Sequence, residues 1–136
     1  MHQLQFSTDV MTRLQADAGR YDERAFLFVL AAIEYLQSRL EVRRHVSGPE
    51  LAWGCRDLAV RQFGLLAPQV LRYWGLHRTE DFGRIVFTLV RAGLLSTQSH
   101  DRETDFAGVY DFDSAFGEAY VWEGVAALCA RGLGEE

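Results

Sequence analysis

The fold that we expect is decided by the apolar run Ala25-Phe26-Leu27-Phe28-Val29-Leu30-Ala31-Ala32-Ile33. Arg24 and Glu34 bound this run, which is too short to cross a bilayer. Asp22 is placed to cap a helix ahead of it, and Arg39 suits the carbonyl end of that helix. The sequence therefore predicts a long helix over residues 22–40, apolar on most sides and buried by several neighbours.

Start and stop signals on either side of this run predict four shorter helices. The first begins at Ser7 and ends near Gly19. The second follows Ser47-Gly48-Pro49-Glu50, which combines a capping serine, an early proline and a capping-box glutamate, and it ends at Gly64. The third covers residues 69–74. The fourth begins at a Thr79 cap, carries an apolar stripe at helical spacing and ends at Gly93.

The helical spacing of apolar residues ends at Gly93, and a different pattern follows. Residues 94–98 and 109–112 are predicted as two strands around a polar tip, followed by a helical turn that Asp113 caps. The expected fold class is mostly α with a small C-terminal β-hairpin (α+β). The order of elements over residues 48–112 matches a winged-helix-like unit packed on the long central helix. Residues 1–120 are expected to form one domain, and residues 121–136 a C-terminal extension that is partly helical or frayed.

The amino-acid composition excludes several kinds of catalytic and binding site. The chain of 136 residues fits a single domain, and all 14 of its basic residues are arginine. A chain without lysine has no Schiff-base lysine and no lysine of the kind that nucleotide-binding loops use. Residues 101–136 hold nine of the 19 acidic residues, and the net charge is −5. Attraction of the whole protein to nucleic acid or to an anionic membrane is therefore not expected.

The cysteines and the N-terminal residues indicate in which cellular compartment the protein is expected. Cys55 and Cys129 are far apart and fit no zinc or disulfide spacing, and the first ten residues do not resemble a signal peptide. We expect a cytoplasmic protein with no cofactor, in which Cys55 is a small buried apolar group.

Three blocks of sequence, in this order, resemble a family of small uncharacterised bacterial proteins known by a locus-tag label beginning "Minf". The blocks are Arg44-His45-Val46-Ser47-Gly48 with Glu50-Leu51; Trp74-Gly75-Leu76 with Thr79-Glu80-Asp81-Phe82-Gly83 and Ile85-Val86-Phe87; and Gly93-Leu94-Leu95 with Asp105-Phe106, Tyr110-Asp111-Phe112-Asp113 and Ala115-Phe116. The resemblance covers roughly residues 5–120. Residues 100–105 depart from the family pattern, which has a serine-arginine-glutamate-aspartate run there. The resemblance implies a single domain and leaves the function open.

Two helix starts carry the candidate binding residues. Arg44 and His45 precede one start, and His77 and Arg78 precede the other. Because helix N-termini present free N–H groups, these residues are predicted to hold a phosphate or carboxylate if the two starts converge. The alternative is that His45 is an interior hydrogen-bonding residue and that the arginines pair with nearby carboxylates.

Three other patterns argue against specific chemistries. The acidic segment from Asp101 fails the calcium-loop pattern, because Phe106 and Phe112 occupy the glycine and glutamate positions. The helix over residues 80–92 is expected to present Glu80, Asp81, Arg84, Thr88 and Arg91 on its outer face, and the two acids among them disfavour DNA. His100 is interpreted as a lone surface histidine, so no metal site and no catalytic residue is predicted.

The aromatic residues favour a binding role. Trp53 and Trp122 are predicted to anchor a partner at the surface, with rim packing as the alternative. The leading hypothesis is a non-catalytic protein-interaction or regulatory module whose partner is another protein or a second copy of the chain. The alternatives are a winged-helix-like nucleic-acid-binding protein and an anion-binding sensor or enzyme with a site near His45 and His77.

Overall fold

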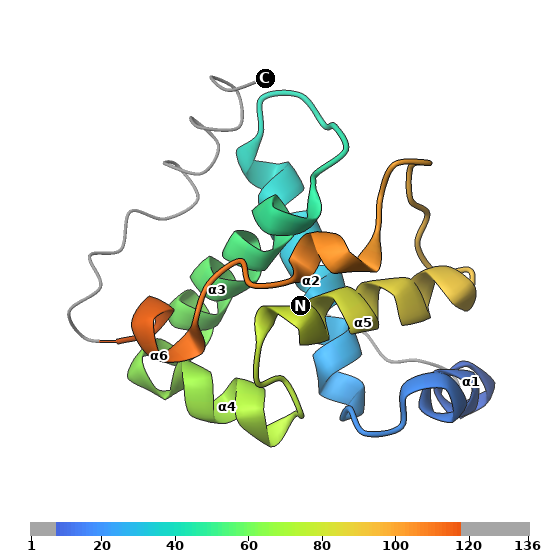
Figure 1. Ribbon diagram of the computed structural model, residues 1–136, viewed down its shortest axis with the longest axis horizontal. Helices are drawn as coiled ribbons and strands as arrows, with labels where there is room; N and C mark the ends of the chain where they lie inside the picture. The colour runs from blue at the N-terminus through green and yellow to red at the C-terminus, as the bar shows by residue number, and fades with distance from the viewer. Residues whose placement is uncertain (1–7, 118–136) are drawn as a thin grey trace.

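A central helix with neighbours on both sides organises the computed structural model, which describes residues 8–117. In this range α2 contacts both α3 and α5, and α1 packs against α5 (Figure 1). The elements in chain order are α1 (Thr8–Ala18), α2 (Glu23–Arg39), α3 (Gly48–Phe63), the 3₁₀ turn η1 (Gly64–Leu66), α4 (Ala67–Tyr73), α5 (Thr79–Arg91), the 3₁₀ turn η2 (Glu103–Phe106) and α6 (Phe112–Ala115).

The predicted long helix is confirmed as α2. The Asp22 carboxylate accepts a hydrogen bond of 2.9 Å from the backbone N–H of Arg24 and so caps the helix. One residue of α3 controls how closely the next helix approaches. A Cβ atom built on Gly54 would lie 2.6 Å from the side chain of Leu36. The absent side chain of Gly54 therefore allows α3 to pack directly against α2.

The start of α3 is also as predicted, whereas the start of α5 differs in detail. Ser47 and Glu50 form the reciprocal capping box. Thr79, expected to cap α5, is instead its first helical residue and is fully buried. Its hydroxyl donates to the carbonyl oxygen of Phe106 at 2.6 Å and accepts from the backbone N–H of Val109 at 3.2 Å. Thr79 thus attaches the segment after η2 to the core.

The expected β-hairpin is wrong, and with it the α+β class and the wing. The structure of residues 8–117 contains no strand. At the first expected strand, the Leu94 amide donates to the carbonyl of Leu89 and completes the end of α5. Carboxylates then take backbone amides nearby in the chain: Asp101 accepts from Gln98, Asp105 from Arg102 and Asp111 from Ser114. Such local bonds compete with strand pairing.

A buried aromatic ring fixes the segment that replaces the hairpin. Phe106 lies at the end of η2 and is almost fully buried. Cβ atoms built on Gly48 and Gly83 would come within 3.2 Å and 2.8 Å of its ring. The ring therefore occupies a slot between the first turns of α3 and α5, and a side chain on either glycine would narrow it. In Figure 1 the orange η2 accordingly lies across α5.

The last turn begins earlier than predicted. Asp111, rather than Asp113, caps α6. The buried guanidinium of Arg56 donates to the Ala115 carbonyl at 3.0 Å and pairs with Asp57 at 3.2 Å, so α6 is attached to α3. Residues 121–136, predicted as an extension, lie outside the described residues. No helix within residues 8–117 has both the length and the apolar character needed to span a bilayer.

Candidate functional site

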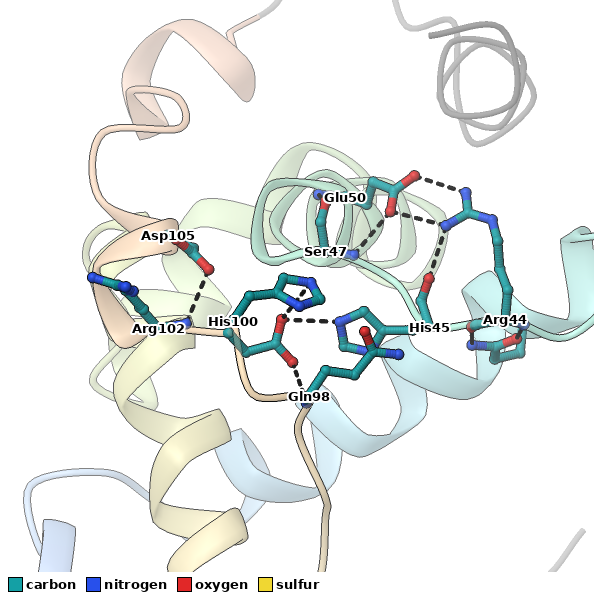
Figure 2. Close-up of polar contacts among 10 residues, drawn as sticks. Arg44, His45, Ser47, Glu50, Gln98, His100, Arg102 and Asp105 are labelled. Carbon is teal, nitrogen blue, oxygen red and sulfur yellow. Dashed lines mark hydrogen bonds and ion pairs between the residues drawn. The ribbon is translucent and has the colours of Figure 1, made fainter. Parts of the chain in front are cut away.

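The first predicted binding pair, Arg44 and His45, lies in the connector between α2 and α3. The Arg44 guanidinium makes two bonds to the Glu50 carboxylate, at 2.8 Å and 3.2 Å (Figure 2). Burial raises the pKa of Glu50, but hydrogen bonds from Arg44 and from the Ser47 amide outweigh it and lower the pKa below its usual value. A carboxylate of the chain itself therefore already occupies the N-terminus of α3.

The second predicted pair, His77 and Arg78, lies at the start of α5. Their backbone amides donate to one oxygen of Asp81, at 2.8 Å and 3.1 Å. The other oxygen accepts from the Tyr21 hydroxyl at 2.6 Å and from the Arg20 guanidinium. Burial raises the Asp81 pKa, but these bonds and the Arg20 charge outweigh it and lower the pKa. This helix start, too, holds a carboxylate of the chain.

The predicted aromatic pair is only half described. Trp53 is partly buried, and its ring centroid lies 4.6 Å from that of Tyr110. The Tyr110 hydroxyl in turn donates to the Ala52 carbonyl at 2.8 Å. Trp53 thus contributes to packing the segment before α6 against α3. Trp122 lies outside the described residues, so the predicted role of the two tryptophans in anchoring a partner stays a prediction.

Helix α5 packs into the core, so part of its expected outer face is buried. Asp81 and Thr88, both assigned to that face from the sequence, are buried. Arg91 makes two bonds to Asp17 of α1, at 2.6 Å and 3.2 Å. A recognition helix for DNA needs a free polar face. Two residues of the expected face are therefore covered by the rest of the fold, whereas Glu80, Arg84 and Arg91 are exposed.

One predicted residue, His45, has a partner that sequence analysis missed. Its Nε2 atom lies 3.0 Å from the Oδ1 atom of Asp101, which is 56 residues away in the chain. The backbone N–H of Gln98 donates to the other oxygen of Asp101 at 2.8 Å and fixes the carboxylate (Figure 2). The contact joins the connector before α3 to the segment after α5. The sequence carries no periodic signal for such a contact between two irregular segments.

The His45–Asp101 contact lies at the edge of a cavity of about 200 Å³. The cavity is open to solvent on one side and is lined by α2, the N-terminal half of α3, the C-terminal half of α5 and the segment over residues 95–106. His77, Arg78 and Arg44 do not line it. Most of its wall is apolar and is formed by Ile33, Val46, Leu51, Val86, Phe87, Leu95 and Phe106. The polar side chains of the lining are those of Gln37, His45, Ser47, Ser96, Thr97, Asp101, Arg102 and Asp105. A concave site that combines apolar surface with polar groups is typical of small-molecule binding.

Comparison with models of known protein families, with curated proteins and with solved structures finds no match to this chain. The resemblance to the "Minf" family therefore stays a prediction, and the function is argued from the site alone.

Proposed function

We propose that the protein is a non-catalytic regulatory module that binds a small, largely apolar molecule in the cavity beside His45. The observation that carries this proposal is the cavity itself, which lies between three helices and has a mostly apolar wall. Burial of apolar ligand surface there would supply the main driving force, at about 25 cal/mol per Å². The segment over residues 95–106 forms one side of the cavity, so ligand binding would act directly on that segment.

Three polar side chains of the lining, Gln37, Asp101 and Asp105, already have partners within the chain, which favours an apolar ligand beside them. The Gln37 side chain bonds both the N–H and the carbonyl of Arg44, and Asp105 accepts the Arg102 amide. Asp101 is bonded to the Gln98 amide and to His45. Groups with these internal partners gain little from a polar ligand, because its hydrogen bonds would replace existing ones. Selectivity would then come from the shape of the apolar wall.

The hydroxyl nearest to His45 along the chain has a structural role. Ser47 lies two residues from His45, but its Oγ atom accepts the Glu50 amide as part of the capping box. The His45 imidazole bonds Asp101 instead. A serine nucleophile needs a base within hydrogen-bond reach of its hydroxyl. No such Ser–His pair is recorded between these two residues.

Two substitutions in one connector test the proposal. V46F places a larger side chain in the cavity wall, whereas V42F makes the same change at a strongly exposed position. Ligand-observed NMR of the full chain against a library of small apolar fragments, with EDTA present, would measure binding. Fragments should bind to wild type and V42F and lose binding to V46F, with unchanged helical circular dichroism. Absence of any fragment binding, or equal binding to V46F, would refute the proposal.

An exposed apolar patch supports a second candidate function, protein binding. Leu65, Leu66 and Tyr73 are 73%, 62% and 78% exposed. All three residues belong to the continuous stretch formed by η1 and α4. Large apolar side chains gathered at a surface are typical of interfaces. This patch, rather than Trp53, is the part of residues 8–117 that best supports the interaction module predicted from the sequence.

The protein-binding candidate is tested with L66E and a control, V42E. A partner that co-purifies with wild type and V42E should be lost with L66E. Light scattering across a concentration series would show whether that partner is a second copy of the chain. Retention of every partner by L66E would count against the patch.

A cytoplasmic location belongs to the same proposal and is supported by Cys55, a free thiol in the core.

A further inference from the structure

Three side chains that prefer metal ions come together at the edge of the cavity. His45 comes from the connector before α3, and His100 and Asp101 come from the segment after α5. The two imidazole rings meet edge to face, with centroids 5.9 Å apart (Figure 2). The Nε2 atoms of His45 and His100 lie 3.0 Å and 3.9 Å from the same oxygen of Asp101. One donor atom from each residue lies within 4.8 Å of the other two.

We propose that His45, His100 and Asp101 form a binding site for a divalent first-row transition metal ion, with Zn²⁺ as the reference ion. Two imidazole nitrogens and a carboxylate oxygen are a common ligand set for such ions. A hard ion such as Mg²⁺ prefers oxygen ligands and fits this set poorly. The site is a property of the folded chain, because its two contributing segments are far apart in the sequence.

The spacing of the donors supports the assignment. Metal–ligand bonds of about 2.0–2.2 Å in a tetrahedral site separate neighbouring donors by about 3.3–3.6 Å. The two measured separations from Asp101, 3.0 Å and 3.9 Å, lie on either side of this range. The side chain of His100 is 72% exposed, so its approach to the ion is a rotation in solvent rather than a rearrangement of the core.

The other two donors are held in place by the fold. The Asp101 side chain is only 13% exposed, and the Gln98 amide bonds its second oxygen. The backbone carbonyl of His45 accepts from the Arg44 guanidinium at 2.8 Å, and that guanidinium is paired with Glu50. Fixed ligands lose little conformational freedom when an ion binds, which is the role that supporting contacts play around metal sites.

Three protein ligands leave at least one coordination position for water or for another molecule. His45 and Asp101 also line the cavity, so a bound ion would lie at its edge. The ion would join the connector before α3 to the segment after α5. The metal site does not depend on the cavity taking an organic ligand, and the two proposals are tested separately because the fragment experiment contains EDTA.

Isothermal titration calorimetry of the full chain with Zn²⁺ tests the site. The protein is prepared without a histidine tag, treated with EDTA and then freed of it, in an H2Q background that removes the histidine near the N-terminus. We expect one Zn²⁺ ion per chain. H45Q, H100Q and D101N should each weaken binding by at least about tenfold. H77Q and D113N are matched controls elsewhere on the surface and should bind as the parent does.

Replacement of Zn²⁺ by Co²⁺ adds a structural readout, because visible absorption bands report its coordination. The bands should appear with the parent and disappear with H100Q, whose exposed side chain can be changed without disturbing the core. A chain that shows no saturable Zn²⁺ binding would overturn the site. So would binding that survives all three ligand substitutions, or that H77Q abolishes equally. Each of these three results would leave the His45–Asp101 contact as a simple hydrogen bond.

Discussion

Removal of the Thr79 hydroxyl tests how the segment after η2 is held. T79V keeps the shape of the side chain but deletes the donor to Phe106 and the acceptor for Val109. In T79V the carbonyl of Phe106, a buried residue next to residue 79, loses its hydrogen-bond donor. The amide of Val109, a partly exposed residue, loses its acceptor. An unpaired buried polar group costs about 1–3 kcal/mol, so we expect T79V to lose about 2 kcal/mol of unfolding free energy.

Urea denaturation followed by circular dichroism measures this loss. With a slope of about 2 kcal/mol per M, the midpoint should fall by about 1 M without a change in slope. T79S is the control, because it keeps the hydroxyl and loses only a buried methyl group, which costs about 0.8 kcal/mol. Hydrogen exchange gives a local readout: the Val109 amide should exchange faster in T79V than in T79S.

The opposite result would refute the argument. In a β-hairpin the Val109 amide would donate to a backbone carbonyl of the partner strand and would not respond to Thr79. Equal stability of T79V and T79S, together with unchanged protection of Val109, would therefore refute the role of Thr79 in holding this segment.

Three further predictions concern the core. Folding lowers the pKa of Asp81, so its contribution to the unfolding free energy should be complete above the unfolded pKa near 3.8 and be lost as the pH falls below that value. In urea denaturation at several pH values, D81N should reduce this loss of stability at acidic pH. G54A forces a Cβ against Leu36 and should cost about 1–3 kcal/mol, and L36A should recover part of this in the double mutant, as thermal unfolding would show. R56M leaves Asp57 buried without this cation and should cost about 3–5 kcal/mol; a loss below about 1 kcal/mol in urea would contradict the buried pair.

Local signals account for the parts of the fold that the sequence predicted well. The apolar run in α2, the Asp22 cap and the Ser47–Glu50 capping box all act within a few residues, so they can be recognised without knowing the tertiary structure. The same holds for the end of α5, where Gly93 adopts a positive φ of 81°. These signals place helices but do not say what fills the space between them.

The segment over residues 94–112 was predicted wrongly because its structure depends on distant residues. Phe106 is buried only because Gly48 and Gly83, from two different helices, leave room for its ring. Residues 109–112 are predicted as a strand, yet the Val109 amide bonds a side chain of α5. Neither fact is visible in the segment itself.

The candidate site was predicted in part, for the same reason. His45 was singled out because it precedes a helix start, and it does line the cavity. Its expected companions His77 and Arg78 lie at a different helix start, beside Asp81. In the sequence, Asp101 begins a segment that fails the calcium-loop pattern, and His100 is interpreted as a lone surface histidine. Their proximity to His45 comes from the path of the chain after α5.

The anchoring of η2 has a consequence for how this protein can change over evolutionary time. The chain leaves α5 through a closed helix end at Gly93 and is fixed again at Phe106. Between these points the side chains are mostly exposed, so substitutions there disturb the core little. His100 and Asp101 lie in this tolerant stretch, whereas His45 lies beside a helix cap. Substitutions on one side of the cavity can therefore change its lining while the fold, and the opposite side, stay the same.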